Sequence, residues 1–374
     1  MLLSRLVMIC PTLADHGGHE FDYTSAVASA SAADGVETIT VTGKNAEDFS
    51  LPGRVEKTLP PYGYPPSPLA RALTALRRFA AYLTLFRRHG AEDALFFVHS
   101  APQNELPVML FAWLCALRPG RLTLFLRHDI AETWAKSILI RLLAFAHNAG
   151  ARYVSDSDSL IENLAPRLGC PIALLPIPAL LPKDIERDAG ITVCGYFGAR
   201  RRQKGFALLP ALATAAKKQD AQTRFVFQAY RHREDKVDVG LEAALSDLRK
   251  NDGIRLIEHV LDTENFGREL AACDIILIPY DSGFYGEATS GIFVMGVVAR
   301  AVVVVTDGNW MARQAGRHAL GRVVLMPNNP TPAQMEEALR AAFEKRRQPD
   351  APGPAEKAWC ESQTAKGIWK ILSI

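Results

Sequence analysis

Short runs of apolar residues alternate with longer amphipathic stretches along the whole chain. In the first half, the apolar runs occupy positions 5–10, 36–42, 94–99, 122–126, 153–155 and 172–175. In the second half, they occupy positions 192–197, 224–229, 254–257, 275–278, 302–305 and 323–325. Parallel strands need crossover connections between them, and the amphipathic stretches have the length that crossover helices require. The pattern therefore predicts an α/β fold with two Rossmann-like domains, one in each half.

A proline-rich segment at 176–182, followed by a polar stretch at 183–190, separates the two series of strands. The chain of 374 residues is also too long for one ordinary hydrophobic core. We therefore expect an N-terminal domain at 1–182, a C-terminal domain at 183–350, and a tail at 351–374 whose helix packs back on the first domain. Ligands of such sheets bind at the carboxyl ends of the strands, so the two domains are expected to face each other across a cleft.

Composition excludes several classes of protein. A hydrophobic fraction of 48% and a charged fraction of 22% are typical of a soluble globular protein. A net charge of +3, with no nucleic-acid reading motif, argues against a dedicated nucleic-acid binder. The six cysteines are scattered without metal-ligand spacing, which indicates free thiols in a reducing, cytoplasmic compartment and no structural zinc.

The start of the chain predicts a strand rather than a signal peptide, because its apolar run is short and is interrupted by Arg5. Elsewhere, no run reaches the roughly 18 to 20 apolar residues of a transmembrane helix.

The segment 285–305 is the strongest indication of a ligand. It passes from a polar, glycine-containing loop into an apolar helix and then into a valine-rich strand. Ser290 and Gly291 lie where that helix is expected to begin. A helix N-terminus presents unpaired N–H groups and a partial positive charge, and both features suit a phosphate.

A second segment of the same kind lies upstream, where the strand at 192–197 is followed by a basic loop and a helix. Arg201 and Lys204 in this loop have the chemistry to neutralise a diphosphate, the arginine as a fork and the lysine as a mobile point charge. The alternative is that the arginine run simply faces solvent, as charge runs often do. We expect these cations to take the place of a divalent metal ion.

Residues at the ends of other strands are further candidates. Gly17 and Gly18 follow the first strand, where they allow a close approach to a ligand or simply form a turn. His128 follows the strand at 122–126, where it either meets a ligand or is a structural histidine. Tyr280 and Asp281 follow the strand at 275–278 and either reach the ligand or close the loop.

Together these segments resemble the retaining glycosyltransferases of the GT-B fold, in particular the family 4 type that includes bacterial mannosyltransferases and exopolysaccharide and lipopolysaccharide glycosyltransferases. The resemblance covers nearly the whole chain. It is carried by 196–205, which resembles the diphosphate loop of that family, by 273–280, which resembles the strand before its donor loop, and by the loop and helix from Glu287.

The resemblance implies roles for individual residues. Arg201 and Lys204 would hold the donor diphosphate, and the backbone at Ser290 and Gly291 would cap it, with the Gly17–Gly18 loop close by. Glu287 matches the first glutamate of the E-x7-E motif, which faces the donor sugar, and His128 matches a histidine beside the transferred sugar. Tyr280, Asp281 and Thr289 would lie near the sugar or the base.

Two positions depart from the pattern of that family. Met295 stands where the second glutamate of the motif is expected, and Arg300-Ala301-Val302 replaces the usual Gly-Lys-Pro. A methionine cannot accept hydrogen bonds from a ribose as a carboxylate does.

The resemblance implies an N-terminal acceptor domain and a C-terminal nucleotide-sugar donor domain. It also implies metal-independent transfer of a sugar, with retention, from a nucleoside diphosphate sugar to a hydroxyl of a lipid-linked or polysaccharide precursor. The sequence is compatible with a uridine or a guanosine donor. A non-catalytic binding protein and a nucleotide-sugar epimerase of the same fold are alternatives, whereas the lack of G-x-G-x-x-G after the first strand argues against a dehydrogenase.

Residues 68–90 predict an amphipathic helix with five arginines, at positions 71, 77, 78, 87 and 88, beside apolar residues. A basic amphipathic helix of this kind is suited to peripheral contact with an anionic membrane, here the inner face of the cytoplasmic membrane. A surface crossover helix has the same pattern. The apolar stretch at 138–146 is expected to lie in the core.

Overall fold

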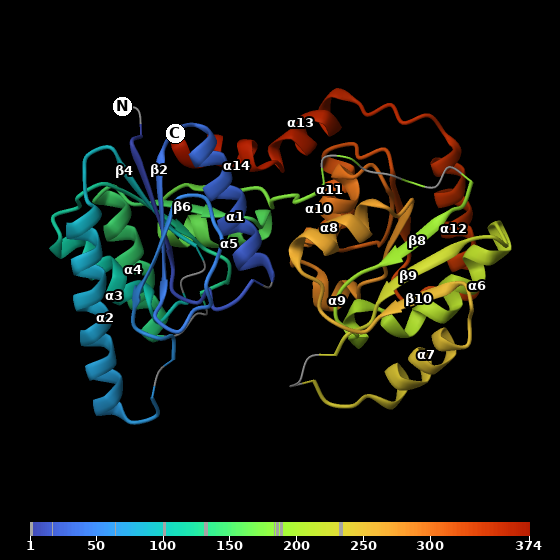
Figure 1. The fold of residues 1–374 in the computed structure, drawn as a ribbon, viewed down its shortest axis with the longest axis horizontal. Coiled ribbons are helices and arrows are strands. Elements are labelled where there is room, and N and C mark those ends of the chain that lie inside the picture. Colours follow the sequence, from blue (N-terminus) through green and yellow to red (C-terminus); the bar gives the residue numbers. More distant parts are fainter. Residues whose placement is uncertain are drawn as a thin grey trace. The chain divides into compact units, whose positions relative to one another are not determined.

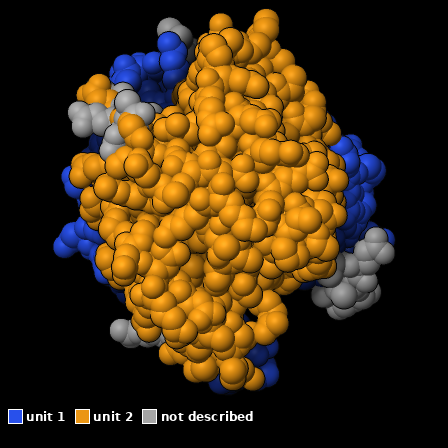
Figure 2. Space-filling model, turned by 90° about the vertical axis from the view of Figure 1, so that its right-hand side faces the viewer, with its two compact units in different colours: residues 1–177, 365–374 blue, residues 178–364 orange. Residues whose placement is uncertain are grey.

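The chain forms two compact units. The computed structural model describes residues 3–16, 18–63, 65–99, 102–130, 134–182, 184, 187, 190–231 and 235–374. Unit 1 comprises Met1–Ile177 and Ala365–Ile374, and unit 2 comprises Pro178–Thr364 (Figure 2). The chain thus leaves unit 1 at 177/178 rather than at 182/183, and the returning tail begins at 365 rather than at 351.

Unit 1 is built on a seven-stranded sheet in the order β3-β2-β1-β4-β5-β6-β7, with every pairing parallel (Figure 1). Its strands are β1 (Arg5–Cys10), β2 (Glu37–Gly43), β3 (Arg54–Leu59), β4 (Ala94–Val98), β5 (Arg121–Phe125), β6 (Arg152–Ser155) and β7 (Ile172–Leu174). The strand order reverses between β1 and β4. At such a switch point the loops at the carboxyl ends diverge and leave room for a ligand.

Strand β3 is missing from the elements that the apolar runs predict. Its sequence, Arg-Val-Glu-Lys-Thr-Leu, contains only two apolar residues, and only Leu59 of it is buried. The reason is its position at the edge of the sheet, where one side is open to solvent and a continuous apolar run is not needed.

The helices of unit 1 are α1 (Gly18–Ala33), α2 (Pro68–His89), α3 (Leu106–Cys115), α4 (Trp134–Asn148), α5 (Asp158–Leu168) and α14 (Ala365–Ser373). Apolar side chains from α2, α3, α4 and α5 form one core with the sheet. Helix α14 packs on α1, and the indole Nε1 of Trp369 donates to Asp34 Oδ2 at 2.7 Å. This contact confirms the prediction that the C-terminal helix returns to the first domain.

Unit 2 repeats the architecture with a six-stranded parallel sheet in the order β10-β9-β8-β11-β12-β13 (Figure 1). Its strands are β8 (Val193–Tyr196), β9 (Arg224–Gln228), β10 (Ile254–Ile257), β11 (Ile275–Ile278), β12 (Val302–Thr306) and β13 (Val323–Met326). Its helices are α6 (Leu209–Gln219), α7 (Val239–Arg249), α8 (Thr263–Ala271), α9 (Ser282–Tyr285), α10 (Gly291–Val298), α11 (Trp310–Arg317), α12 (Pro332–Arg347) and α13 (Pro354–Ser362). The switch point of this sheet lies between β8 and β11. Both predicted Rossmann-like sheets are therefore confirmed.

Arg300 explains why the first part of the tail stays with unit 2. It follows α10 with a left-handed φ of 63°, a conformation that costs a non-glycine residue roughly 1–2 kcal/mol. Its guanidinium pairs with Asp350 and, at 2.7 Å, with Glu356, which is buried on α13. A glycine would adopt this backbone without strain, but it would leave α13 without that anchor.

Candidate functional site

The loops that follow β8 and β11 meet at the switch point of the unit 2 sheet. Gly205, in the first loop, has a φ of 69°, and a Cβ on it would lie 2.0 Å from the carbonyl oxygen of Pro279. The N–H of Asp281, in the second loop, donates to the carbonyl of Gln203 at 2.9 Å. Because the two loops touch through their backbones, position 205 requires glycine, and each loop holds the other in place.

Lys204 lies at the centre of this junction. Gly198, just after β8, has a φ of 116°, and a Cβ on it would lie 2.9 Å from Lys204 Nζ and 3.7 Å from Ile292 Cδ1. The ammonium also lies over the ring of Tyr280, 5.5 Å from its centroid. The ammonium of Lys204, the buried backbone of Gly198 and the side chain of Ile292 in the first turn of α10 therefore lie close together.

Helix α10 presents N–H groups at the same point. The buried side chain of Ser290 caps the helix and accepts a hydrogen bond from the N–H of Phe293 at 3.3 Å. Within the part of the chain that the structure describes, the N–H groups of Gly291 and Ile292 donate to no acceptor. These two donors and the positive end of the helix dipole thus belong to the turn whose Ile292 side chain lies beside Gly198 and Lys204.

The charge of Lys204 has no carboxylate partner among the described residues. The side chain is half-buried, and burial lowers the pKa of Lys204 to about 8, with the nearby charge of Arg201 acting in the same direction. An ammonium with this pKa is still mostly protonated at pH 7. A bound anion would relieve both the desolvation and the repulsion.

The three arginines before Lys204 behave differently, because each pairs with a carboxylate at or near the start of α7. The pairs are Arg200–Glu242 at 2.9 Å, Arg201–Asp235 at 3.2 Å and Arg202–Asp238 at 2.8 Å. Arg201 uses Nε and Nη2 together on Asp235. Of the two predicted diphosphate ligands, Lys204 is therefore the one whose charge is not already compensated among the described residues.

Glu287 lies on the exposed loop before α10 and pairs with a residue that sequence reasoning missed. Its Oε2 lies 2.9 Å from Nη2 of Arg313 on α11, and the same nitrogen donates to the carbonyl of Gly286 at 2.8 Å. Thr289 is half-buried on this loop. Met295 is buried within α10. No local sequence pattern connects Arg313 with Glu287, because the contact joins the loop before α10 to a helix that follows the next strand.

Tyr280 and Asp281 have distinct environments. Tyr280 is buried beside Tyr285, with ring centroids 4.6 Å apart, and burial raises its pKa above the usual range. The carboxylate of Asp281 caps α9 by accepting hydrogen bonds from the N–H groups of Gly283 and Phe284. This cap closes the loop, and contact of Asp281 with a ligand stays a prediction.

The candidates of the first half belong to unit 1. His128 is exposed just after β5, whereas His99 is fully buried among aromatic rings. Gly18 is the first residue of α1. Gly17 lies outside the described residues.

Sequence reasoning also missed a polar cluster at the carboxyl edge of the unit 1 sheet. The hydroxyl of Thr12 donates to Glu20 Oε1 at 2.7 Å, and burial raises the pKa of Glu20 to about 7 against the opposing effects of that hydrogen bond and of Arg127. The Arg127 guanidinium lies over the rings of Tyr23 and Phe125. These residues follow or flank β1 and β5, so only the sheet brings them together.

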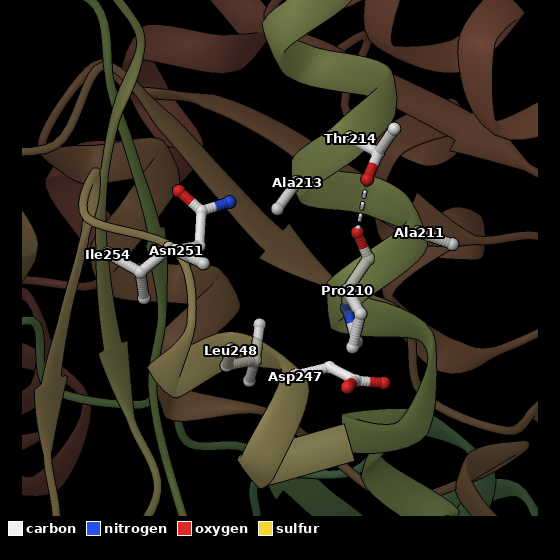
Figure 3. Close-up of a pocket in the computed structure, with 8 residues that line it drawn as sticks. All are labelled: Pro210, Ala211, Ala213, Thr214, Asp247, Leu248, Asn251 and Ile254. Carbon is white, nitrogen blue, oxygen red and sulfur yellow. Dashed lines mark hydrogen bonds between the residues drawn. The ribbon is translucent and has the colours of Figure 1, made fainter. Parts of the chain in front are cut away.

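A pocket of about 350 Å³ lies elsewhere on unit 2, between α6 and α7 and beside the first residue of β10 (Figure 3). Asn251, which lines it, already accepts from Lys217 at 2.6 Å, and Thr214 donates to the carbonyl of Pro210. Because β10 begins at the amino edge of the sheet, this pocket is separate from the junction around Lys204. It supplies no group that suits an anion.

Neither the protein-family models nor the curated proteins include a match to this sequence. Solved structures do match it, at low identity over almost the full length. A putative UDP-N-acetylglucosamine 2-epimerase from Listeria monocytogenes has a TM-score of 0.63 at 12% identity and covers 99% of this chain and 94% of its own. HepE from Anabaena, in complex with UDP-glucose, has a TM-score of 0.60 at 13% identity and covers 98% of both chains.

WaaG, a glycosyltransferase involved in lipopolysaccharide biosynthesis, has a TM-score of 0.53 at 13% identity and covers 98% of this chain and 95% of its own. Identities this low establish shared architecture only. The two Rossmann-like units share the order of their first six strands, and these structures match the chain from end to end, which shows that the chain has the GT-B fold.

Proposed function

We propose that this protein is a glycosyltransferase that moves a sugar from a nucleoside diphosphate sugar to a hydroxyl acceptor, with retention at the anomeric carbon and without a metal. The observation that carries the proposal is the proximity of the Lys204 ammonium to the first turn of α10, where the N–H groups of Gly291 and Ile292 have no acceptor among the described residues. Each of these groups suits a phosphate oxygen.

The chemistry follows from where charge develops. When the bond between the anomeric carbon and the diphosphate breaks, the leaving diphosphate gains negative charge. Lys204 and the first turn of α10 lie close together in the folded protein, so they would stabilise that charge without large reorganisation. Arg201 would add its charge to the diphosphate site once it is released from Asp235. Glu287 and His128 would position the sugar. In such a transfer the acceptor hydroxyl gives its proton to the leaving diphosphate as the new glycosidic bond forms.

The acceptor is proposed to be a lipid-linked or polysaccharide precursor of the cell envelope. This part of the proposal rests on the basic amphipathic helix α2, which suits peripheral contact of residues 68–90 with the inner face of the cytoplasmic membrane. HepE and WaaG support a nucleotide-sugar donor and a cell-envelope product respectively, as proteins of the same fold.

A ligand screen of the full chain tests the donor site. UDP, GDP, ADP and their common sugars are added with and without EDTA, and the melting temperature is measured. A nucleotide at 100 times its Kd stabilises the folded protein by about 2.7 kcal/mol, which corresponds to a rise of roughly 5–10 °C for a unit of this size. We expect one nucleotide to do so equally in EDTA.

Incubation of that donor with and without glycan acceptors then separates the enzyme classes. Release of the nucleoside diphosphate supports transfer. Interconversion of two nucleotide sugars without an acceptor would identify an epimerase, and binding without turnover would identify a binding protein.

Replacement of Glu287 by alanine tests its proposed contact with the sugar. Loss of one charge-assisted hydrogen bond in the transition state should lower kcat by roughly 10- to 100-fold, while the Kd for the nucleoside diphosphate changes less than threefold. The matched control is Glu264→Ala, which removes an exposed carboxylate paired with an arginine on α8. Unchanged turnover in Glu287→Ala would remove Glu287 from the mechanism.

A further inference from the structure

The outer side of α2 carries a stripe of exposed leucines. Leu69, Leu73 and Leu76 are 72%, 49% and 63% exposed, and their spacing places them on one face of the helix. The opposite face, with Tyr82 and Phe86, is buried in the core. Figure 1 shows that the first turns of α2 extend beyond the ends of α3 and α4. A stripe of large apolar side chains on a projecting helix has no packing role within unit 1.

The neighbouring helices continue this apolar surface. Phe111 on α3 is 58% exposed, and its ring lies 5.5 Å from that of Phe79 on α2. On α4, Ile138 and Phe145 are exposed two turns apart, although the sequence pattern predicts that this stretch lies in the core. Helix α3 contacts both α2 and α4. Exposed apolar side chains on three adjacent helices mark an interaction surface rather than isolated exceptions.

The charged residues of these three helices all carry the same sign. Helices α2, α3 and α4 contain no Asp or Glu and seven basic residues, which are Arg71, Arg77, Arg78, Arg87, Arg88, Lys136 and Arg141. Arg78 points inward and is buried against Glu105, so the sequence-based prediction that places it on the membrane face is wrong. The six remaining basic residues on α2 and α4 exceed the net charge of +3 of the whole chain, so positive charge is concentrated on these helices.

We infer that the outer face of α2, α3 and α4 docks on an anionic lipid bilayer, with the leucines and phenylalanines inserted among the lipids and the arginines at their phosphates. No described helix has the length and apolarity needed to cross a bilayer, so this contact is interfacial. The inference extends the proposed membrane contact from one helix to a three-helix surface.

A second copy of the chain is a poorer partner for this face. In a two-fold symmetric dimer the same patch faces itself, and arginines would oppose arginines across the interface with no carboxylate on these helices to compensate them. An anionic bilayer supplies the opposite charge and an apolar interior together. Charge complementarity therefore selects the bilayer.

The test is flotation of the full-length protein with vesicles of phosphatidylcholine alone or with 30% phosphatidylglycerol. We expect binding only to the anionic vesicles, with a loss of at least tenfold when salt is raised from 0.1 to 0.5 M, because salt screens exposed charges. Leu69→Ser/Leu73→Ser/Leu76→Ser should bind the anionic vesicles at least tenfold more weakly. Since these leucines are exposed, the variant should keep its melting temperature.

The matched control is Leu174→Ser/Leu325→Ser, which removes two exposed leucines from other surfaces and should bind as wild type does. Equal binding of the triple variant, or no binding of wild type to anionic vesicles, would overturn the inference. So would a wild-type dimer in sedimentation equilibrium that the triple variant abolishes. Nucleotide-induced stabilisation is measured in the same variants, so failure of docking is distinguished from failure of the donor site.

Discussion

Replacement of Lys204 by alanine is expected to weaken binding of the nucleoside diphosphate by roughly 10- to 100-fold, the equivalent of one charge-assisted hydrogen bond. The reason is that Lys204 is the predicted phosphate ligand that no described carboxylate already neutralises. Isothermal calorimetry at pH 7 measures the change. The matched control is Arg202→Ala in the same loop, where an exposed arginine pairs with Asp238, and we expect a change of less than threefold.

The same site predicts a pH dependence. Because burial lowers the pKa of Lys204 to about 8, the affinity of the free protein for the diphosphate should fall as pH rises above 8, by up to tenfold per unit. Lys204→Arg keeps its charge at these pH values, so any affinity it retains should not fall in this way. Equal affinities for wild type and Lys204→Ala, or a flat pH profile for wild type, would place the diphosphate elsewhere.

The melting temperature of Lys204→Ala shows whether the variant has lost only the anion site or has also lost its fold. A lysine whose pKa is lowered in the folded state contributes stability that is present above its unfolded pKa and is lost as pH falls through about 8. At pH 7 the buried charge is therefore a cost. Without ligand, Lys204→Ala should melt at the wild-type temperature or above it, as expected where a functional group is held at the expense of stability.

Replacement of Arg78 by methionine is expected to lower the free energy of unfolding by about 3–5 kcal/mol, because it leaves the carboxylate of Glu105 buried without its counter-ion. The side chains of Arg78 and Glu105 are only 2% and 1% exposed. Nη2 of Arg78 also donates to the carbonyls of Pro61 at 2.9 Å and Gly63 at 3.0 Å, so this residue ties the loop before α2 to the core.

Urea unfolding of the full chain measures this effect, and two variants make the result specific. Arg77→Met changes the exposed neighbour of Arg78 on the same helix and should stay within about 0.5 kcal/mol of wild type. Arg78→Met/Glu105→Leu removes both charges and should recover most of the lost stability. A loss below 1 kcal/mol in Arg78→Met would contradict the assignment of a buried ion pair.

The fold was predictable from the sequence because its determinants are local. Apolar runs of strand length, separated by amphipathic stretches, predict parallel sheets wherever they occur, and all twelve predicted runs form strands. The helix cap at Ser290 was predictable for the same reason, because the cap and the apolar helix are adjacent in the chain. Strand β3 escaped prediction because an edge position relaxes the need for an apolar run.

Which charges are available for a ligand was decided only by the tertiary structure. The basic loop carries four cations that the local sequence does not distinguish, which are Arg200, Arg201, Arg202 and Lys204. In the part of the chain that the structure describes, the fold brings carboxylates from positions 235–242 to the three arginines and not to the lysine. The pairs Glu287–Arg313 and Arg78–Glu105 could not be predicted either, because their members are also far apart in the sequence. Hydrophobic periodicity is set by a residue's neighbours in the chain, whereas the compensation of a charge depends on partners more than twenty residues away, which only packing brings within reach.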